Sequence, residues 1–351
     1  MTIPARSRRA TRPRTLLLLA IPLLLALSAV AGVLFTRPHQ PSKMTLPLRH
    51  VGEVALPGDG SRFDYASLDP GRGLLFIAHL GAGEVIEVSV RTGRVVRVIK
   101  ALSDVHGVLV VPQLHRVYAT ATGDNAVAAI DEDTGQILTR TATGAYPDGL
   151  AYDPLRHTVW ITNEAGGSET VIDAATGTLR GTVPLGGEAG NVAYDPGAGQ
   201  ILADVQGSNT LAVIDPATLT VTRRVPLPGC DHSHGLALDP AGRLAFIACD
   251  GNAALLTLDL NTWQVTGHDT VGQDPDVLTY DPGIRRLYVA AESGWVTTLG
   301  AHDRHLTVTG RAHLADGAHI VAVDPATHRS YYPVTHGPDG HPTLSIYEPA
   351  R

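Results

Sequence analysis

The 351-residue sequence is poor in the residues that form most catalytic and cofactor motifs. It contains two cysteines, two methionines, three tryptophans and four phenylalanines, and aromatic residues make up 5% of the chain. Because there is no Cys-x-x-Cys pair and no Cys-x-x-Cys-His motif, we expect no c-type heme. His-Glu-x-x-His, Gly-x-Ser-x-Gly and a glycine-rich phosphate loop are absent as well, which excludes the enzyme classes that these motifs define.

Acidic residues are missing from the first 43 positions. This segment holds seven of the 27 Lys and Arg residues and none of the 34 Asp and Glu residues. The rest of the chain therefore has 20 basic and 34 acidic residues, a net charge of about −14. Phosphate backbones need clustered basic residues, so we expect no nucleic-acid partner.

A long apolar run occurs once, near the N-terminus. A basic n-region, residues 1–15, precedes an apolar segment, residues 16–36, which is about as long as a bilayer is thick, and a proline-rich linker follows over 37–47. The run is either a signal peptide cleaved after Ala29-Val30-Ala31 or a membrane anchor helix. In both cases the n-region is cytoplasmic and the remainder lies outside the cytoplasm: periplasmic, secreted or membrane-anchored.

The remainder, residues 48–351, repeats one pattern seven times. Turn prolines recur every 42 to 44 residues, at Pro70, Pro112, Pro154, Pro196, Pro240, Pro282 and Pro325. Each repeat contains four short runs rich in Val, Ile, Tyr and Thr, separated by turn residues. This period and composition predict an all-β fold, a seven-bladed β-propeller of four-stranded antiparallel blades.

The ends of the chain predict how the ring closes. The last repeat stops after Leu344–Tyr347 without a fourth strand, whereas His50–Leu56 precedes the first repeat as an unpaired strand. We therefore expect the N-terminal strand to complete the last blade, which removes an open sheet edge.

The candidate site residues lie six positions before the turn prolines, at the start of each innermost strand. These seven positions, here called the slots, hold Asp64, His106, Asp148, Gly190, His234, Asp276 and His319. Equivalent positions face one axis, so the six side chains should form a ring at one mouth of the channel. Second-tier candidates lie at the ends of the second strands, on the same face, or beside a slot: His79, Asn163, Glu164, His232, Asp250 and Glu292.

The ring has three interpretations. Its side chains can bond the backbone and hydrate the channel, they can bind a small polar ligand, or they can bind a divalent metal ion. Imidazole and carboxylate groups also serve as acids and bases near neutral pH.

The two cysteines, Cys230 and Cys249, fall in one repeat. Both are expected at the same face of the blade, and an even cysteine count outside the cytoplasm favours a disulfide. A pair of buried thiols and a metal-binding pair are the alternatives.

Several repeats carry variants of one phrase, including Val117–Asp131, Val159–Asn163, Asn209–Asp215 and Leu287–Ala291. The phrase resembles the Tyr-Val-Thr-Asn (YVTN) repeat, and the chain resembles the YncE-like β-propeller proteins. That resemblance implies a seven-bladed propeller in the periplasm or cell envelope. The asparagine of the repeat is kept at Asn163 and replaced at Ala121, Val205, Cys249 and Ala291. The resemblance implies no shared catalytic residues.

Two functional hypotheses follow. The first is a cell-envelope binding or scaffold protein that recognises a small ligand, a glycan or an envelope protein at the channel face, with membrane contact through the N-terminal segment if it is not cleaved. The second is a metal-dependent hydrolase of lactonase type that uses the Asp/His ring. The second rests on the ring composition and on analogy with related propellers.

Overall fold

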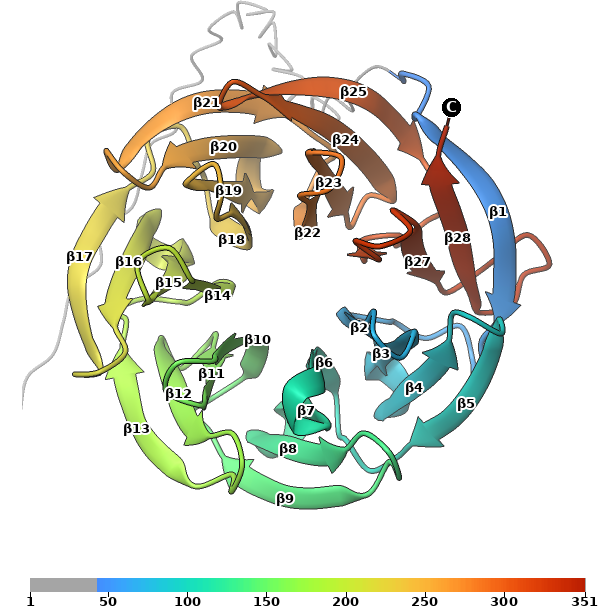
Figure 1. The fold of residues 1–351 in the computed structure, drawn as a ribbon, viewed down its shortest axis with the longest axis horizontal. Helices are drawn as coiled ribbons and strands as arrows, with labels where there is room; N and C mark the ends of the chain where they lie inside the picture. The colour runs from blue at the N-terminus through green and yellow to red at the C-terminus, as the bar shows by residue number, and fades with distance from the viewer. Residues whose placement is uncertain (1–42, 351) are drawn as a thin grey trace, which may run out of the picture. The chain divides into compact units, whose positions relative to one another are not determined.

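The computed structural model describes residues 43–350, which form seven four-stranded antiparallel sheets arranged around a central channel (Figure 1). The first blade contains β2 (Ala66–Asp69), β3 (Leu74–His79), β4 (Glu84–Ser89) and β5 (Arg94–Ile99). The second contains β6 (Val105–Val111), β7 (Arg116–Ala121), β8 (Ala126–Asp131) and β9 (Ile137–Ala142). The third contains β10 (Pro147–Asp153), β11 (Thr158–Asn163), β12 (Ser168–Asp173) and β13 (Leu179–Pro184).

The remaining blades follow the same order from the channel outward. The fourth contains β14 (Val192–Asp195), β15 (Gln200–Val205), β16 (Thr210–Asp215) and β17 (Thr220–Pro226). The fifth contains β18 (Ser233–Asp239), β19 (Leu244–Cys249), β20 (Ala254–Asp259) and β21 (Gln264–Thr270). The sixth contains β22 (Pro275–Asp281), β23 (Arg286–Ala291), β24 (Trp295–His302) and β25 (His305–His313). Short 3-10 turns occur at η1 (Leu80–Ala82), η2 (Pro112–Leu114), η3 (Thr122–Asp124), η4 (Gln206–Ser208) and η5 (Asp250–Asn252).

The seventh blade joins the two ends of the described chain. It consists of β26 (Ala322–Val323), β27 (Ser330–Val334), β28 (Thr343–Pro349) and the N-terminal strand β1 (Leu48–Ala55), in the order β1-β28-β27-β26. Strand β1 runs antiparallel to β28 along the outer edge. The predicted seven-bladed fold and its closure by the N-terminal strand are both confirmed.

The predicted targeting segment cannot be compared with the structure. Residues 1–15, residues 16–36 and most of the 37–47 linker lie outside the described residues. Met44 already bonds the backbone of Arg311 beside β25, ahead of the expected start of the propeller at residue 48. Within residues 43–350, no helix has the length and apolarity needed to cross a membrane.

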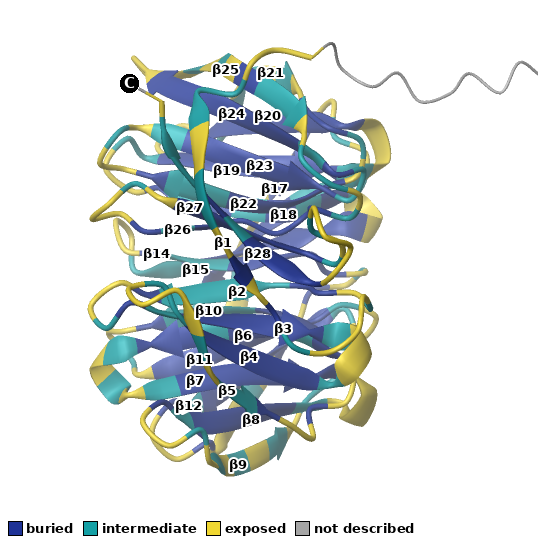
Figure 2. Ribbon diagram, turned by 90° about the vertical axis from the view of Figure 1, so that its right-hand side faces the viewer, coloured by how far each residue is buried: buried dark blue, intermediate teal, exposed yellow. Residues whose placement is uncertain are grey.

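The core lies between neighbouring blades rather than inside one sheet. Every residue of β11 and β19 is buried, whereas the outermost strands alternate between exposed and partly buried positions (Figure 2). The largest buried side chains include Trp160, Tyr118 and Tyr288. Strands covered on both faces are therefore mainly apolar, and outer strands alternate with period two.

Glycine beside the slots lets the innermost strands approach one another. A Cβ atom on Gly107 would lie 2.1 Å from the backbone oxygen of Asp148, and one on Gly235 would lie 2.1 Å from that of Asp276. Any side chain at these positions would force neighbouring blades apart. The turns at the other end of the innermost strands are capped by aspartate, as where Asp69 accepts the backbone N–H of Arg72 at 3.0 Å.

The role of β1 predicts the effect of truncating one of its side chains. Val54 is 5% exposed and lies opposite Leu344 of β28, whereas Val96 of β5 is 45% exposed. We expect Val54→Ala to lower the free energy of unfolding in urea by about 2 kcal/mol, because a cavity is left in the closing blade. The control Val96→Ala should change it by less than about 0.5 kcal/mol. Equal effects of the two variants would contradict closure by β1.

Candidate functional site

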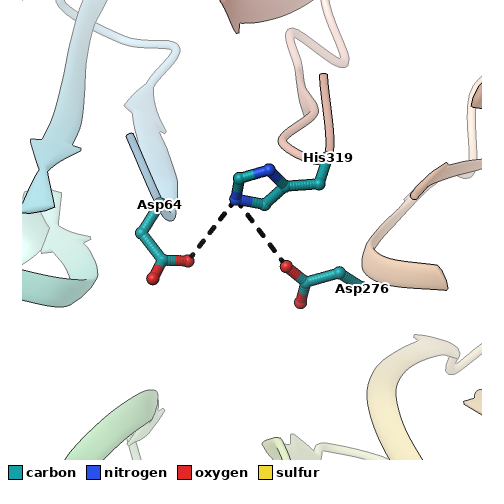
Figure 3. Close-up of side chains that lie close together, drawn as sticks. All are labelled: Asp64, Asp276 and His319. Atoms are coloured by element: carbon teal, nitrogen blue, oxygen red, sulfur yellow. Dashed lines mark ion pairs between the residues drawn. The ribbon is translucent and has the colours of Figure 1, made fainter. Parts of the chain in front are cut away.

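The slot side chains of three consecutive blades meet at the channel mouth. His319, which precedes β26, places Nε2 3.9 Å from Oδ1 of Asp64 and 3.8 Å from Oδ2 of Asp276 (Figure 3). His234 of β18 places its Nε2 3.2 Å from Oδ1 of Asp276, and His106 of β6 places its Nε2 3.8 Å from Oδ2 of Asp64. The predicted ring therefore forms on this side of the channel, with imidazoles next to carboxylates.

All three ring imidazoles are held in the same way. Nδ1 of His319 lies 2.8 Å from the carbonyl oxygen of Gly317, and Nδ1 of His106 lies 2.7 Å from that of Asp104. Nδ1 of His234 lies 3.1 Å from Oε1 of Gln206. A carbonyl oxygen only accepts, so each Nδ1 carries a proton and donates it. Each Nε2 consequently faces the carboxylates.

Burial and crowding shift the protonation of the ring. Burial, together with the charges of Asp148 and Asp276, holds the pKa of Asp64 well above its ordinary value. Burial also raises the pKa of Asp148 to about 7. Although burial opposes it, Asp276 keeps a lowered pKa because it pairs with His234, whose own pKa is raised to about 10 against its desolvation by Asp276 and Asp148. Asp276 and His234 thus form a buried ion pair.

The fourth blade lacks a slot side chain, and two other residues fill its place. Asp204 of β15 is fully buried, and its Cβ lies 3.0 Å from where a Cβ on Gly190 would stand. Asn191, which follows the slot, accepts a hydrogen bond from the Tyr65 hydroxyl at 3.0 Å across the channel. Tyr65 lines both the pocket at the mouth and a smaller cavity of about 170 Å³ deeper in the channel, so it separates the two.

A pocket of about 640 Å³ opens over the ring. Eight carboxylate residues line it: Asp64, Asp104, Asp148, Glu164, Asp250, Asp274, Asp276 and Glu292. Arg62 is the one Lys or Arg among the described residues of this lining. Its guanidinium lies 2.6 Å from Oε1 of Glu292 and 3.8 Å from Oδ2 of Asp64, and these charges raise its pKa in spite of burial. The pocket is therefore strongly acidic.

The second-tier candidates divide into two groups. Glu164, His232, Asp250 and Glu292 line the pocket. His79 does not: it is fully buried behind the ring, where Nε2 lies 3.0 Å from the Ser61 hydroxyl. Asn163 is also fully buried, and its side chain bonds the Gly144 N–H and the hydroxyls of Ser168 and Thr170. Neither residue lines the pocket.

Several pocket residues were not among the predicted candidates. Arg62, Tyr65, Tyr146 and Gln206 lie outside the slots but line the pocket. Tyr146 donates its hydroxyl hydrogen to Nε2 of His106 at 3.0 Å. Tyr65 directly follows a slot, and Arg62 lies two positions before one, so the slot alignment could have found them if it had been widened by two residues.

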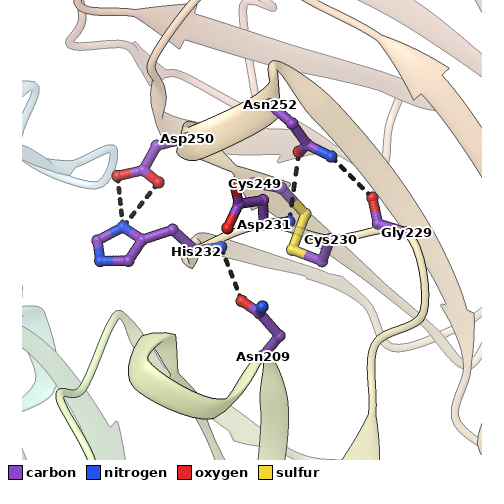
Figure 4. Close-up of a disulfide and its surroundings, with 8 residues drawn as sticks. All are labelled: Asn209, Gly229, Cys230, Asp231, His232, Cys249, Asp250 and Asn252. Carbon is purple, nitrogen blue, oxygen red and sulfur yellow. Dashed lines mark hydrogen bonds and ion pairs between the residues drawn. A yellow bond between two sulfur atoms is a disulfide. The ribbon is translucent and has the colours of Figure 1, made fainter.

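The predicted disulfide is present at the rim of this pocket. Cys230 and Cys249 are bonded, with their Cα atoms 5.3 Å apart (Figure 4). The bond joins the two segments that carry His232 and Asp250, where Nδ1 of His232 lies 2.7 Å from the Asp250 carboxylate. The backbone N–H of His232 also bonds Oδ1 of Asn209, which belongs to the neighbouring blade.

One group in the ring has the composition and spacing to hold a metal ion. The donor atoms of Asp64, Asp276 and His319 all lie within 4.8 Å of one another, and all three residues are buried. Two carboxylates and one imidazole suit a divalent ion.

Comparison with known proteins gives the fold and no family. No family model matches the chain, and no curated protein matches it. A solved structure titled Kuenenia stuttgartiensis hydrazine synthase is similar, with a TM-score of 0.69 and 15% sequence identity over 80% of this chain and 94% of that chain. The chain is a seven-bladed β-propeller with an acidic pocket at its channel mouth, and membership of the YncE-like family is not shown.

The disulfide provides a test of how the pocket rim is fixed. The two cysteines are 19 positions apart, so by loop closure we expect Cys230→Ser/Cys249→Ser to lower the free energy of unfolding in urea by about 3 kcal/mol. A reductant should destabilise the parent by a similar amount and leave the double variant unchanged. Reaction of the unreduced, denatured parent with two equivalents of a thiol reagent would contradict the bond.

Proposed function

We propose that this propeller is an extracytoplasmic binding protein that recognises a small, positively charged ligand in the pocket at its channel mouth. The observation that carries the proposal is the lining of that pocket, with eight carboxylate residues and one arginine around about 640 Å³. This volume is typical of small-molecule sites. A low-dielectric wall strengthens the attraction of fixed carboxylates for a cation.

The shape of the ring favours a ligand that is held by polar groups at fixed positions. Nδ1 of each ring imidazole bonds a carbonyl oxygen that does not belong to the ring, and this bond fixes the direction in which Nε2 points. Tyr65 closes the floor through its bond to Asn191. Such preorganised groups lose little entropy when a ligand binds.

Two features support a location outside the cytoplasm. The N-terminal basic segment and its apolar run have the composition of a signal peptide or membrane anchor. The Cys230–Cys249 disulfide is the kind of bond that persists in an oxidising compartment. The small, charged pocket favours a small cation over a glycan or an envelope protein as its ligand. A scaffold role of the propeller would include those larger partners.

Two four-carbon probes of opposite charge test the proposal. By isothermal titration calorimetry at pH 8, 1,4-diaminobutane should bind and succinate should not. Asp148→Asn should weaken diamine binding by about tenfold or more, because it removes a desolvated charge partner. The control Asp303→Asn lies on an exposed turn between β24 and β25, at the opposite face, and should bind as the parent does.

Diamine binding should also depend on pH. The pKa of Asp148 is about 7 in the free protein, and a bound cation favours its carboxylate form. Affinity should therefore rise as the pH rises through 7 and fall toward pH 5. Binding of succinate as tight as that of the diamine, or diamine binding that Asp148→Asn leaves unchanged, would overturn the proposal.

A second candidate function is a metal-dependent hydrolase of lactonase type. The specific observation in its favour is the Asp64–Asp276–His319 group, which has the spacing to hold a metal ion. In such a reaction water adds to the lactone carbonyl, the ring C–O bond breaks, and a hydroxy acid forms. A bound divalent ion would polarise the carbonyl, and a neighbouring imidazole or carboxylate would accept the proton from water.

Lactone turnover separates the two candidates. If the hydrolase reading holds, zinc-loaded or calcium-loaded protein should release acid from γ-butyrolactone in a pH-stat. Asp64→Asn should lower kcat/KM by about 100-fold, while Asp303→Asn leaves it unchanged. A rate no higher than that of metal-containing buffer would remove this candidate and leave the binding function standing.

A further inference from the structure

We propose that Asp64, Asp276 and His319 form a binding site for one divalent first-row transition-metal ion, with Zn²⁺ as the reference case. The inference goes beyond the binding of an organic cation, and it concerns one side of the ring only. The three residues come from the slots of the first, sixth and seventh blades, which are neighbours around the channel.

The orientation of His319 is the observation that points to an ion. Its side chain is 3% exposed, and Nε2 has no hydrogen-bond partner within residues 43–350. Nδ1 is held by the carbonyl oxygen of Gly317 at 2.8 Å and lies 3.4 Å from Oε2 of Glu292. With Nδ1 bonded to Gly317, Nε2 faces Asp64 and Asp276 without a hydrogen bond to either, and a metal ion between the three side chains would supply the missing contact.

The donor spacing fits a small ion. Nε2 of His319 lies 3.8 Å and 3.9 Å from the nearest oxygens of Asp276 and Asp64, and all three donor atoms lie within 4.8 Å. Ligands about 2.1 Å from a tetrahedral zinc ion are about 3.4 Å apart, so the donor atoms would have to approach one another by about 0.4 to 1.4 Å to bind the ion. The Nδ1 bond to Gly317 is the outer contact that commonly orients a metal-binding histidine.

The donor set selects the class of ion. Imidazole nitrogen with two carboxylates suits zinc, manganese, iron(II) or cobalt, whereas magnesium and calcium favour shells made of oxygen alone. Asp64 and Asp276 both line the pocket, which gives the ion an entry path, and three protein ligands leave a position for water or a ligand.

Neighbouring cations leave the inner oxygens available. Arg62 lies nearest to Oδ2 of Asp64, at 3.8 Å, and bonds Glu292 more closely at 2.6 Å. His234 takes Oδ1 of Asp276. Oδ1 of Asp64 and Oδ2 of Asp276 are the oxygens that face His319. Each carboxylate therefore has one oxygen nearest a neighbouring cationic side chain and the other oxygen facing the imidazole.

The test uses the full-length chain in detergent, stripped with EDTA and titrated with Zn²⁺ by calorimetry. We expect one equivalent to bind to the parent, and Mg²⁺ to bind at least about 100-fold more weakly. His319→Ala and the isosteric Asp64→Asn should each weaken zinc binding by about 100-fold or more, since even outer-shell changes cost about 10- to 100-fold. Circular dichroism shows whether each variant is folded. If His319→Ala does not fold, Asp64→Asn still tests the site.

His305→Ala is the matched control, because His305 is exposed on β25 at the opposite end of the blade. It should bind zinc as the parent does. Zinc bound equally by the parent and His319→Ala would place the ion on surface histidines and overturn the inference, as would the absence of stoichiometric binding. Titration of the same samples with 1,4-diaminobutane distinguishes the two proposals. The proposed function requires the diamine to bind to the zinc-free parent, whereas the metal site does not.

Discussion

The close approach of the innermost strands at the channel mouth is the constraint on which the site depends. Gly107 and Gly235 let one blade's backbone touch the slot residue of the next, and the Tyr65 N–H bonds the carbonyl of His106 in the following blade. Backbone contacts of this kind fix where the slot side chains of these neighbouring blades begin. The slot side chains are therefore crowded together, and imidazole nitrogens lie within 4 Å of carboxylate oxygens from neighbouring blades.

That crowding determines the electrostatics of the pocket. Burial alone would neutralise several carboxylates, and Asp64 and Asp148 do have raised pKa values. Asp276 stays ionised because a protonated His234 lies beside it. The ring is therefore asymmetric: one side holds the His234–Asp276 ion pair, and the other holds His319, whose Nε2 has no hydrogen-bond partner among the described residues. A cation bound beside His319 would complete contacts that the protein's own groups leave open.

The sequence predicted the fold and the ring position but not the internal partners of the ring. A period of 42 to 44 residues and a missing last strand are properties of the chain itself, so blade number and closure followed from them. The second-tier candidates mixed two adjacent positions of the repeat, and adjacent positions in extended chain point to opposite sides. His79 and Asn163 are the last residues of β3 and β11 and are buried, whereas Glu164 lies one position further along and lines the pocket. Arg62 and Tyr65 lie in an irregular segment within two positions of a slot, so an alignment limited to the slots themselves leaves them out.

Diffraction is the most direct test of whether the channel mouth is a preformed receptor for a cation. Crystals soaked with Zn²⁺ and measured on both sides of the zinc absorption edge should show one strong anomalous peak between Asp64, Asp276 and His319. The three ligand atoms should lie about 2.0–2.2 Å from it, with Nδ1 of His319 still bonded to Gly317. Anomalous peaks confined to surface histidines, with the Arg62 guanidinium seated among the ring carboxylates, would contradict the account.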